Sequence, residues 1–180
     1  APNIVRCRIY SNTAMLGGGL FLSNSGATLL GNTVSSNTVG TGGEGGGLFL
    51  LVSPAQVNDN LIQGNVVAAG AGGGVCLSWS DAMLSGNLIM GNSAAWGGGG
   101  LDLDRSNAYL VNNVVADNQA GQRGSGFYID GRSPRLVHTT IARNGGGDGS
   151  GVCVTDPGTL PSSVSMTNTI ISDHRVGITV

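Results

Sequence analysis

The chain has 180 residues, a formal net charge of −2 and 10% charged side chains, and all eight of its basic residues are arginine. This balance excludes the basic stripe that binding to a nucleic acid or to an anionic membrane surface requires. We therefore expect no nucleic-acid partner. No apolar run approaches the roughly 18 residues of a transmembrane helix, so we also expect no membrane insertion. Glycine accounts for 33 residues, which indicates a repeated backbone requirement.

A short tag, in which glycine precedes an apolar-x-apolar triplet, recurs along the whole chain. The first copies are Gly19-Leu20-Phe21-Leu22 and Gly47-Leu48-Phe49-Leu50. Further copies follow at intervals of 25 to 28 residues, beginning at Gly74, Gly100, Gly126, Gly151 and Gly177. The first and third residues of the triplet are aliphatic or Phe, whereas the second varies, and this alternation is typical of a strand with one buried face. Gly, Asn and β-branched residues interrupt every window that a helix would need.

Two polar columns lie between the tags. One ends an aliphatic-x-x-Asn element and contains Asn12, Asn37, Asn65, Asn92, Asn118 and Asn144, with Asp173 as a degraded seventh member. The other lies five residues earlier and contains Cys7, Asn32, Asn60, Asn87, Asn113, Thr139 and Asn168. Asparagine tolerates left-handed dihedral angles at sharp bends, and its amide can both donate and accept. We therefore predict that the asparagines of both columns, including Asn168, stack as hydrogen-bonded ladders.

These columns predict an all-β solenoid, a parallel β-helix of about seven coils with a period of about 26 residues. Residues 1–180 form one domain in this interpretation. Both ends leave strand edges unpaired, which favours a fragment of a longer repeat protein, with end-to-end self-association as the alternative. The three scattered cysteines, Cys7, Cys76 and Cys153, are expected to be unpaired apolar side chains.

The elements Gly17-Gly18-Gly19-Leu20 and Val34-Ser35-Ser36-Asn37 resemble the repeats of secreted bacterial right-handed parallel β-helices, the pectate-lyase-like superfamily. Within that group they are similar to the polymorphic outer-membrane protein repeats of the GGA(I/L/V) and FxxN type, with Ile or Val in place of the Phe. The resemblance implies that the β-helix is right-handed and that the protein is exported, either to the extracellular space or to the cell surface. Such repeats occur in adhesins and autotransporter passengers as well as in polysaccharide lyases and hydrolases.

Acidic residues gather at the outward positions of the tag strands. Asp102 and Asp104 share a strand face, and Asp130 is expected to stack on Asp104 at about one strand spacing of 4.8 Å. The residues expected beside them, and our candidates for ligand binding, are Trp79, Arg105, Tyr128, Arg132 and Arg135. Such a group suits an acidic polysaccharide, with carboxylates for acid–base work or for Ca²⁺, arginines for uronate carboxyls and a ring for a sugar. The alternative, which we favour, is a solvated face whose charges are offset by arginine.

We predict a non-catalytic secreted or cell-surface module for adhesion, binding or structural spacing, with a polysaccharide or surface glycan as its partner and no cofactor. The alternative is a polysaccharide lyase or glycoside hydrolase that acts through Asp102, Asp104 and Asp130, with Ca²⁺ held there. A self-stacking, filament-forming subunit is a further alternative. His138 and His174 have no Ser or Cys partner in the alignment of repeats, so neither is expected to be catalytic.

Overall fold

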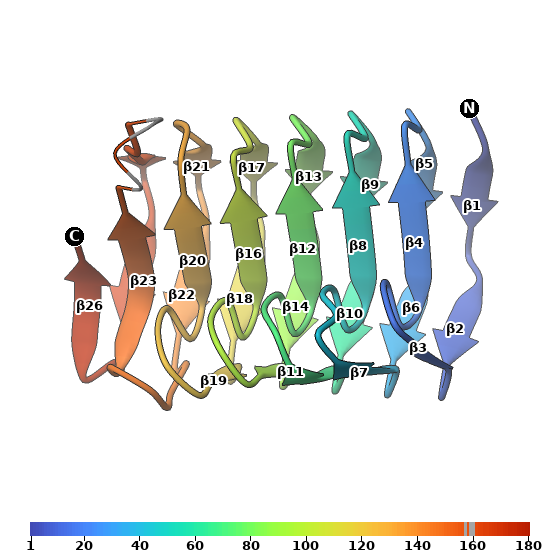
Figure 1. Ribbon diagram of the computed structural model, residues 1–180. Helices are drawn as coiled ribbons and strands as arrows, with labels where there is room; N and C mark the ends of the chain where they lie inside the picture. Colours follow the sequence, from blue (N-terminus) through green and yellow to red (C-terminus); the bar gives the residue numbers. More distant parts are fainter. Residues whose placement is uncertain (157, 159–160) are drawn as a thin grey trace.

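The computed structural model describes residues 1–156, 158 and 161–180. These residues build a parallel β-solenoid of about seven turns, whose strands stack side by side along one axis (Figure 1). No helix is present in this part of the chain, and none therefore is long and apolar enough to cross a membrane. The predicted fold class, period and parallel arrangement are confirmed.

Each turn contributes one short strand to each of up to four parallel sheets. The first sheet contains β1 (Asn3–Val5), β5 (Thr28–Leu30), β9 (Gln56–Asn58), β13 (Met83–Ser85), β17 (Tyr109–Val111), β21 (Arg135–Val137) and β24 (Ser165–Thr167). The second contains β2 (Arg8–Tyr10), β6 (Thr33–Ser35), β10 (Leu61–Gln63), β14 (Leu88–Met90), β18 (Val114–Ala116), β22 (Thr140–Ala142) and β25 (Ile170–Ser172). The third contains β3 (Thr13–Ala14), β7 (Thr38–Thr41), β11 (Val66–Ala69), β15 (Ser93–Ala94) and β19 (Gln119–Ala120). The fourth, formed by the tags, contains β4 (Leu20–Ser23), β8 (Leu48–Leu51), β12 (Val75–Ser78), β16 (Leu101–Asp104), β20 (Phe127–Asp130), β23 (Ser150–Thr155) and β26 (Val176–Thr179).

The strands of each sheet pair in register, so that equivalent residues of successive turns form columns along the axis. In the tag sheet, Leu50 pairs with Leu77, which pairs with Leu103. These three side chains have no exposed area and belong to the one long hydrophobic core inside the solenoid. The alternation of buried and variable positions in the tags therefore places one face of each strand in the core, as the sequence predicts.

Asparagine ladders connect the turns at two bends. The backbone N–H and the Nδ2 of Asn87 both donate to Oδ1 of Asn113 at 2.9 Å, and the same Nδ2 donates to the Val57 carbonyl at 2.7 Å. The same side-chain pattern joins Asn32, Asn60, Asn87 and Asn113 in one ladder, and Asn12, Asn37, Asn65, Asn92, Asn118 and Asn144 in the other. The buried amides of both ladders are thus hydrogen-bonded within the protein.

The left-handed residue at each of these bends is not the asparagine itself, contrary to our expectation. It is the residue before it, as at Asp59 and Asp117, whose φ values are 55° and 58°. Asparagine is present because its amide supplies the donors and the acceptor that the ladder needs.

In the last turn the ladder positions are shifted by one residue from the predicted ones. Ile171, not Ile170, pairs with Ile141, so the position after Asn144 belongs to His174. Asn168 is exposed and has φ of 49°, so its predicted place in a ladder is wrong, and Thr169 follows Thr139 instead. The sequence alone allows either Ile170 or Ile171 to pair with Ile141. The spacing from the preceding tag cannot distinguish the two pairings, because extra residues are inserted in this turn. In the structure Ile171 packs against the core, and this contact sets the register.

A serine ladder, which the sequence analysis missed, runs at the bend after the tag strands. Ser53 N donates to Ser80 Oγ at 2.8 Å, and Ser80 N donates to Ser106 Oγ at 2.9 Å. The hydroxyl of Ser80 in turn donates to the Leu50 carbonyl at 2.9 Å. The signal was present, since these serines all lie six residues after the last glycine of their tag.

Candidate functional site

The outward column of the tag sheet is only partly open to solvent. Its members, each two residues after the tag glycine, are Phe21, Phe49, Cys76, Asp102, Tyr128, Cys153 and Thr179. Asp102 is only 4% exposed, so the expectation that it lies on an open face is wrong. The glycine-rich loop before β16 packs against the start of this strand: a Cβ at Gly98, where φ is 60°, would lie 2.8 Å from Asp102 N. Only glycine allows the loop backbone to pack this closely on the strand.

Asp102 belongs to an acidic cluster with Cys76, which is also buried, and Glu44, which is half-buried. The Sγ of Cys76 lies 3.6 Å from Glu44 Oε2 and 3.6 Å from Asp102 Oδ2, and so stands between two carboxyls from different turns. Burial raises the pKa of Asp102 well above its usual range, and the charges of Glu44 and Asp104 raise it further. Burial also raises the pKa of Glu44, against a hydrogen bond from Cys76. Asp102 therefore favours its protonated form, out of reach of a substrate.

Cys76 is not an activated nucleophile in this cluster. Burial raises the pKa of its thiol well above the usual range, and the charges of Asp102 and Glu44 act in the same direction. A reactive cysteine needs a cationic, accessible environment that stabilises the thiolate. Here the neighbours are acidic and the side chain has no exposed area.

Asp104 and Asp130 stack as the sequence predicts, but neighbouring side chains form polar contacts with both carboxylates. The two residues are direct partners in β16 and β20. Ser78 Oγ donates to Asp104 Oδ2 at 2.9 Å, and Arg105 Nη1 lies 3.3 Å from Asp104 Oδ1. Thr155 Oγ1 lies 3.3 Å from Asp130 Oδ1. Within the described ranges, no group of three or more His, Cys, Asp or Glu side chains is arranged to hold a metal ion.

The five predicted ligand-binding residues do not gather in one site. Arg105 lies over the ring of Trp79, with its Cζ 5.3 Å from the ring centroid. Arg135 lies over Tyr109 at 5.6 Å, on a different sheet. Arg132 has a buried Nε in the bend after β20, and Tyr128 lines a pocket.

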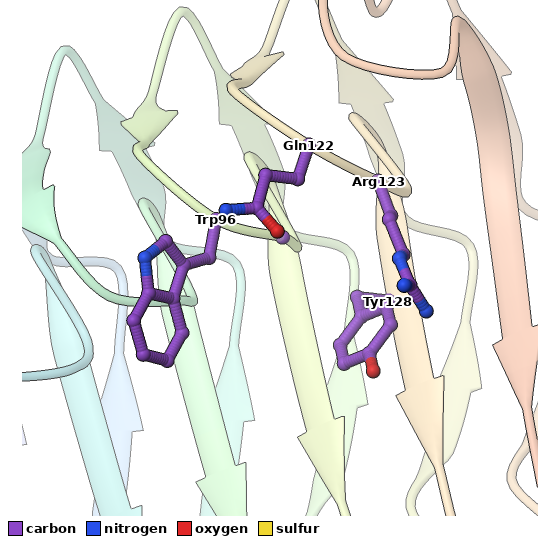
Figure 2. A pocket seen from close by; sticks show the side chains of 5 residues that line it. Trp96, Gln122, Arg123 and Tyr128 are labelled. Atoms are coloured by element: carbon purple, nitrogen blue, oxygen red, sulfur yellow. The ribbon is translucent and has the colours of Figure 1, made fainter.

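That pocket has a volume of about 220 Å³ and lies where two glycine-rich loops meet β20. Its lining residues are Trp96, Gly97, Gln122, Arg123 and Tyr128. Figure 2 shows the rings of Trp96 and Tyr128 on opposite sides of an opening, with the amide of Gln122 above it and Arg123 beside Tyr128. The sequence analysis missed Trp96, Gln122 and Arg123, because they lie in the loops of variable length.

Backbone hydrogen bonds hold the pocket in place. The Trp96 carbonyl accepts from the N–H groups of Gln122 at 2.8 Å and Arg123 at 3.2 Å, and Trp96 N donates to the Gly70 carbonyl at 2.9 Å. Gly97 packs closely on the Tyr128 ring, since a Cβ at this position would lie 3.1 Å from Cγ of that ring. The Tyr128 hydroxyl lies 3.2 Å from Thr155 Oγ1. The loops are therefore part of the stacked structure, and the pocket is preformed.

The chemistry of the lining is that of binding rather than of acid–base catalysis. Two aromatic rings offer apolar faces, and the Gln122 amide can both donate and accept. Arg123 forms no ion pair with any residue that the structure describes, so its guanidinium is free to donate to a ligand. None of the five lining residues is a carboxylic acid, histidine or cysteine.

Comparison with known proteins places the chain in a family on its sequence. The model of the right-handed β-helix region matches residues 45–180, which include the pocket and most of the acidic cluster. No match was found among curated proteins or among solved structures. Since the match spans most of the chain and agrees with the parallel solenoid, the protein belongs to the right-handed β-helix family.

Proposed function

We propose that this protein is a non-catalytic carbohydrate-binding module, and that the pocket between Trp96 and Tyr128 is its binding site. The observation that carries the proposal is the composition of the pocket, which pairs two aromatic rings with an amide and a free guanidinium. Of the three candidate catalytic carboxylates, Asp102 is buried, and Asp104 and Asp130 are hydrogen-bonded to neighbouring side chains.

Each part of the pocket matches a part of a sugar. The apolar C–H face of a sugar ring packs on an aromatic face, and Trp96, which is 58% exposed, presents such a face to solvent. Gln122 and Arg123 supply donors for hydroxyl or carboxylate oxygens. The pocket is smaller than the roughly 300–1,000 Å³ of sites for drug-sized ligands, so it suits one residue of a longer glycan.

The preformed backbone of the pocket also favours binding. A site whose loops are already hydrogen-bonded from turn to turn loses little conformational entropy when a ligand binds. We place the module outside the cell or at the cell surface, where adhesion to a glycan is useful; the family resemblance of the repeats supports this location.

A glycan array and a depolymerisation screen, each with and without Ca²⁺, test the proposal. We expect binding of at least one glycan without cleavage. Trp96→Ala and Arg123→Ala should each weaken that binding by about tenfold or more, in line with about 1.4 kcal/mol for one aromatic or charged contact. Trp79→Ala and Arg135→Ala are matched controls, because they remove the same residue types at exposed positions outside the pocket.

Two outcomes contradict the proposal. Cleavage of a polymer that is lost in Asp104→Asn would make the acidic face an active site. Binding that is equally weakened by the Trp79 and Trp96 substitutions would show that the pocket has no special part in recognition.

A further inference from the structure

The buried carboxyl of Asp102 lies next to the pocket. Asp102 pairs directly with Tyr128 in the tag sheet, so the two side chains are neighbours in the outward column. The loop that carries Trp96 packs against both residues: Gly97 lies against the Tyr128 ring and Gly98 against the backbone of Asp102. This loop therefore contacts both the far wall of the pocket and the strand segment that holds Asp102.

The surroundings of Asp102 contain no positive charge to balance an ionised carboxylate. The charged groups that act on it are Glu44 from the loop before β8, Asp104 on its own strand and Asp130 on β20, all acidic. Cys76 on β12 is the nearest polar group. Of the basic side chains on the adjoining turns, Arg105 is paired with Asp104, and Arg123 lines the pocket beside Tyr128.

One oxygen of this carboxyl has no partner at all. Oδ1 of Asp102 is buried and forms no hydrogen bond with any described residue, although the side chain is almost fully enclosed. A charged oxygen without a partner is strongly disfavoured in this position, whereas a protonated carboxyl is far less so. The cluster is therefore built to hold a proton rather than a metal ion.

We propose that Glu44, Cys76 and Asp102 form a buried proton-binding site that controls the loop carrying Trp96. With the proton bound, the loop packs on β16 and the pocket is formed. When Asp102 ionises, the carboxylate requires water, and water reaches it only when the loop around Gly98 lifts from the strand. Ligand binding is then strongest at acidic pH and weakens as the pH rises. This last consequence depends on the proposed function; the proton site itself does not.

The first test needs no ligand. In a Trp79→Phe background Trp96 is the only tryptophan, so its fluorescence and the melting temperature are followed from pH 4 to pH 10. We expect the fluorescence to change in one transition above the ordinary aspartate range. Because only the folded state keeps the proton over that interval, the unfolding equilibrium constant should rise by up to tenfold per pH unit from the ordinary aspartate pKa up to the transition and level off beyond it, with a matching fall in melting temperature. Asp102→Asn should abolish the transition, and Glu44→Gln should move it to lower pH. Asp81→Asn, at an exposed aspartate in another bend, should leave it in place.

The outcomes separate the two proposals. A transition that survives in Asp102→Asn and is unmoved by Glu44→Gln, or a flat profile in the parent protein, would overturn the proton site. If Asp102→Asn fails to fold, Glu44→Gln alone decides, because a proton site requires its shift. If the transition is present but no glycan binds at any pH, the proton site stands and the carbohydrate proposal fails. If a glycan binds, its affinity should follow the same transition.

Discussion

Asn144 donates two hydrogen bonds to one nitrogen of His174, from its backbone N–H at 3.3 Å and from its Nδ2 at 3.1 Å. Both donors point at Nε2, so this nitrogen must be unprotonated and the proton must be on Nδ1. His174 thereby takes the place of the asparagine that would continue the ladder. The same interaction that extends the ladder also makes this turn sensitive to pH.

The first prediction concerns acid sensitivity at His174. Burial lowers the pKa of its imidazole, against the charge of Asp173, so the folded protein favours the neutral ring. Stability from this group is present above the unfolded pKa of about 6.5 and is lost as the pH falls through the folded pKa. His174→Asn restores an amide acceptor and should flatten the fall in melting temperature between pH 7 and pH 5. His138→Asn, at an exposed left-handed position, should leave that fall unchanged.

The second prediction concerns the asparagine ladder. Asn87→Ala removes the acceptor for Asn60 and the two hydrogen bonds that Nδ2 of Asn87 donates in the buried interior, to the Val57 carbonyl and to Asn113. The backbone donation to Asn113 can survive, so we expect a loss of about 1–3 kcal/mol in the free energy of unfolding, measured with urea. Asn107→Ala is the control at an exposed asparagine and should cost less than about 0.5 kcal/mol. Equal effects of the two substitutions would contradict a structural role for the ladder.

The third prediction separates backbone conformation from close packing at the glycines. Gly91 and Gly98 have nearly the same φ, 62° and 60°, but a Cβ at Gly91 meets nothing within 4 Å, whereas one at Gly98 meets the Leu101 carbonyl. Gly91→Ala should therefore cost only about 1–2 kcal/mol for the left-handed conformation. Gly98→Ala should cost clearly more, because the loop must move off β16. Thermal unfolding of both variants measures the difference, and a similar cost at both positions would show that the loop is not tightly packed.

The fourth prediction concerns the serine ladder. Ser80→Ala leaves the buried backbone N–H of Ser53 without its acceptor, so we expect a loss of about 1–3 kcal/mol in unfolding free energy. Ser78→Ala, two residues earlier, removes a hydroxyl whose partner, Asp104, keeps its contact with Arg105. The Ser78 variant should be affected less, as judged by urea denaturation. A larger effect at Ser78 would argue against the ladder.

The fifth prediction concerns thiol reactivity. Cys7 is exposed, whereas Cys76 and Cys153 are buried, and burial raises the pKa of both buried thiols. An Ellman titration of the folded protein should therefore detect one fast thiol, and all three only after denaturation. Cys7→Ser should remove the fast phase. A fast phase that persists in this variant would show that one of the buried strands opens readily.

The sequence by itself determined the solenoid. A period near 26 residues brings every tag glycine, every core aliphatic residue and nearly every ladder asparagine into columns, because parallel strands in register turn sequence spacing into spatial stacking. Asp104 and Asp130 were placed together correctly for the same reason.

The tertiary structure alone decided the site. The loops before the tag strands vary in length, so no spacing rule relates Trp96 to Tyr128, or Glu44 to Asp102. Their positions depend on where each glycine-rich loop packs across the outer face of the tag sheet, and the same packing buries Asp102. In the last turn an insertion removes the spacing rule as well, and there the burial of Ile171 set a register that moved the ladder position from Asn168 to Thr169. Periodic contacts follow from the sequence, whereas contacts between irregular loops depend on packing that is defined only in the folded chain.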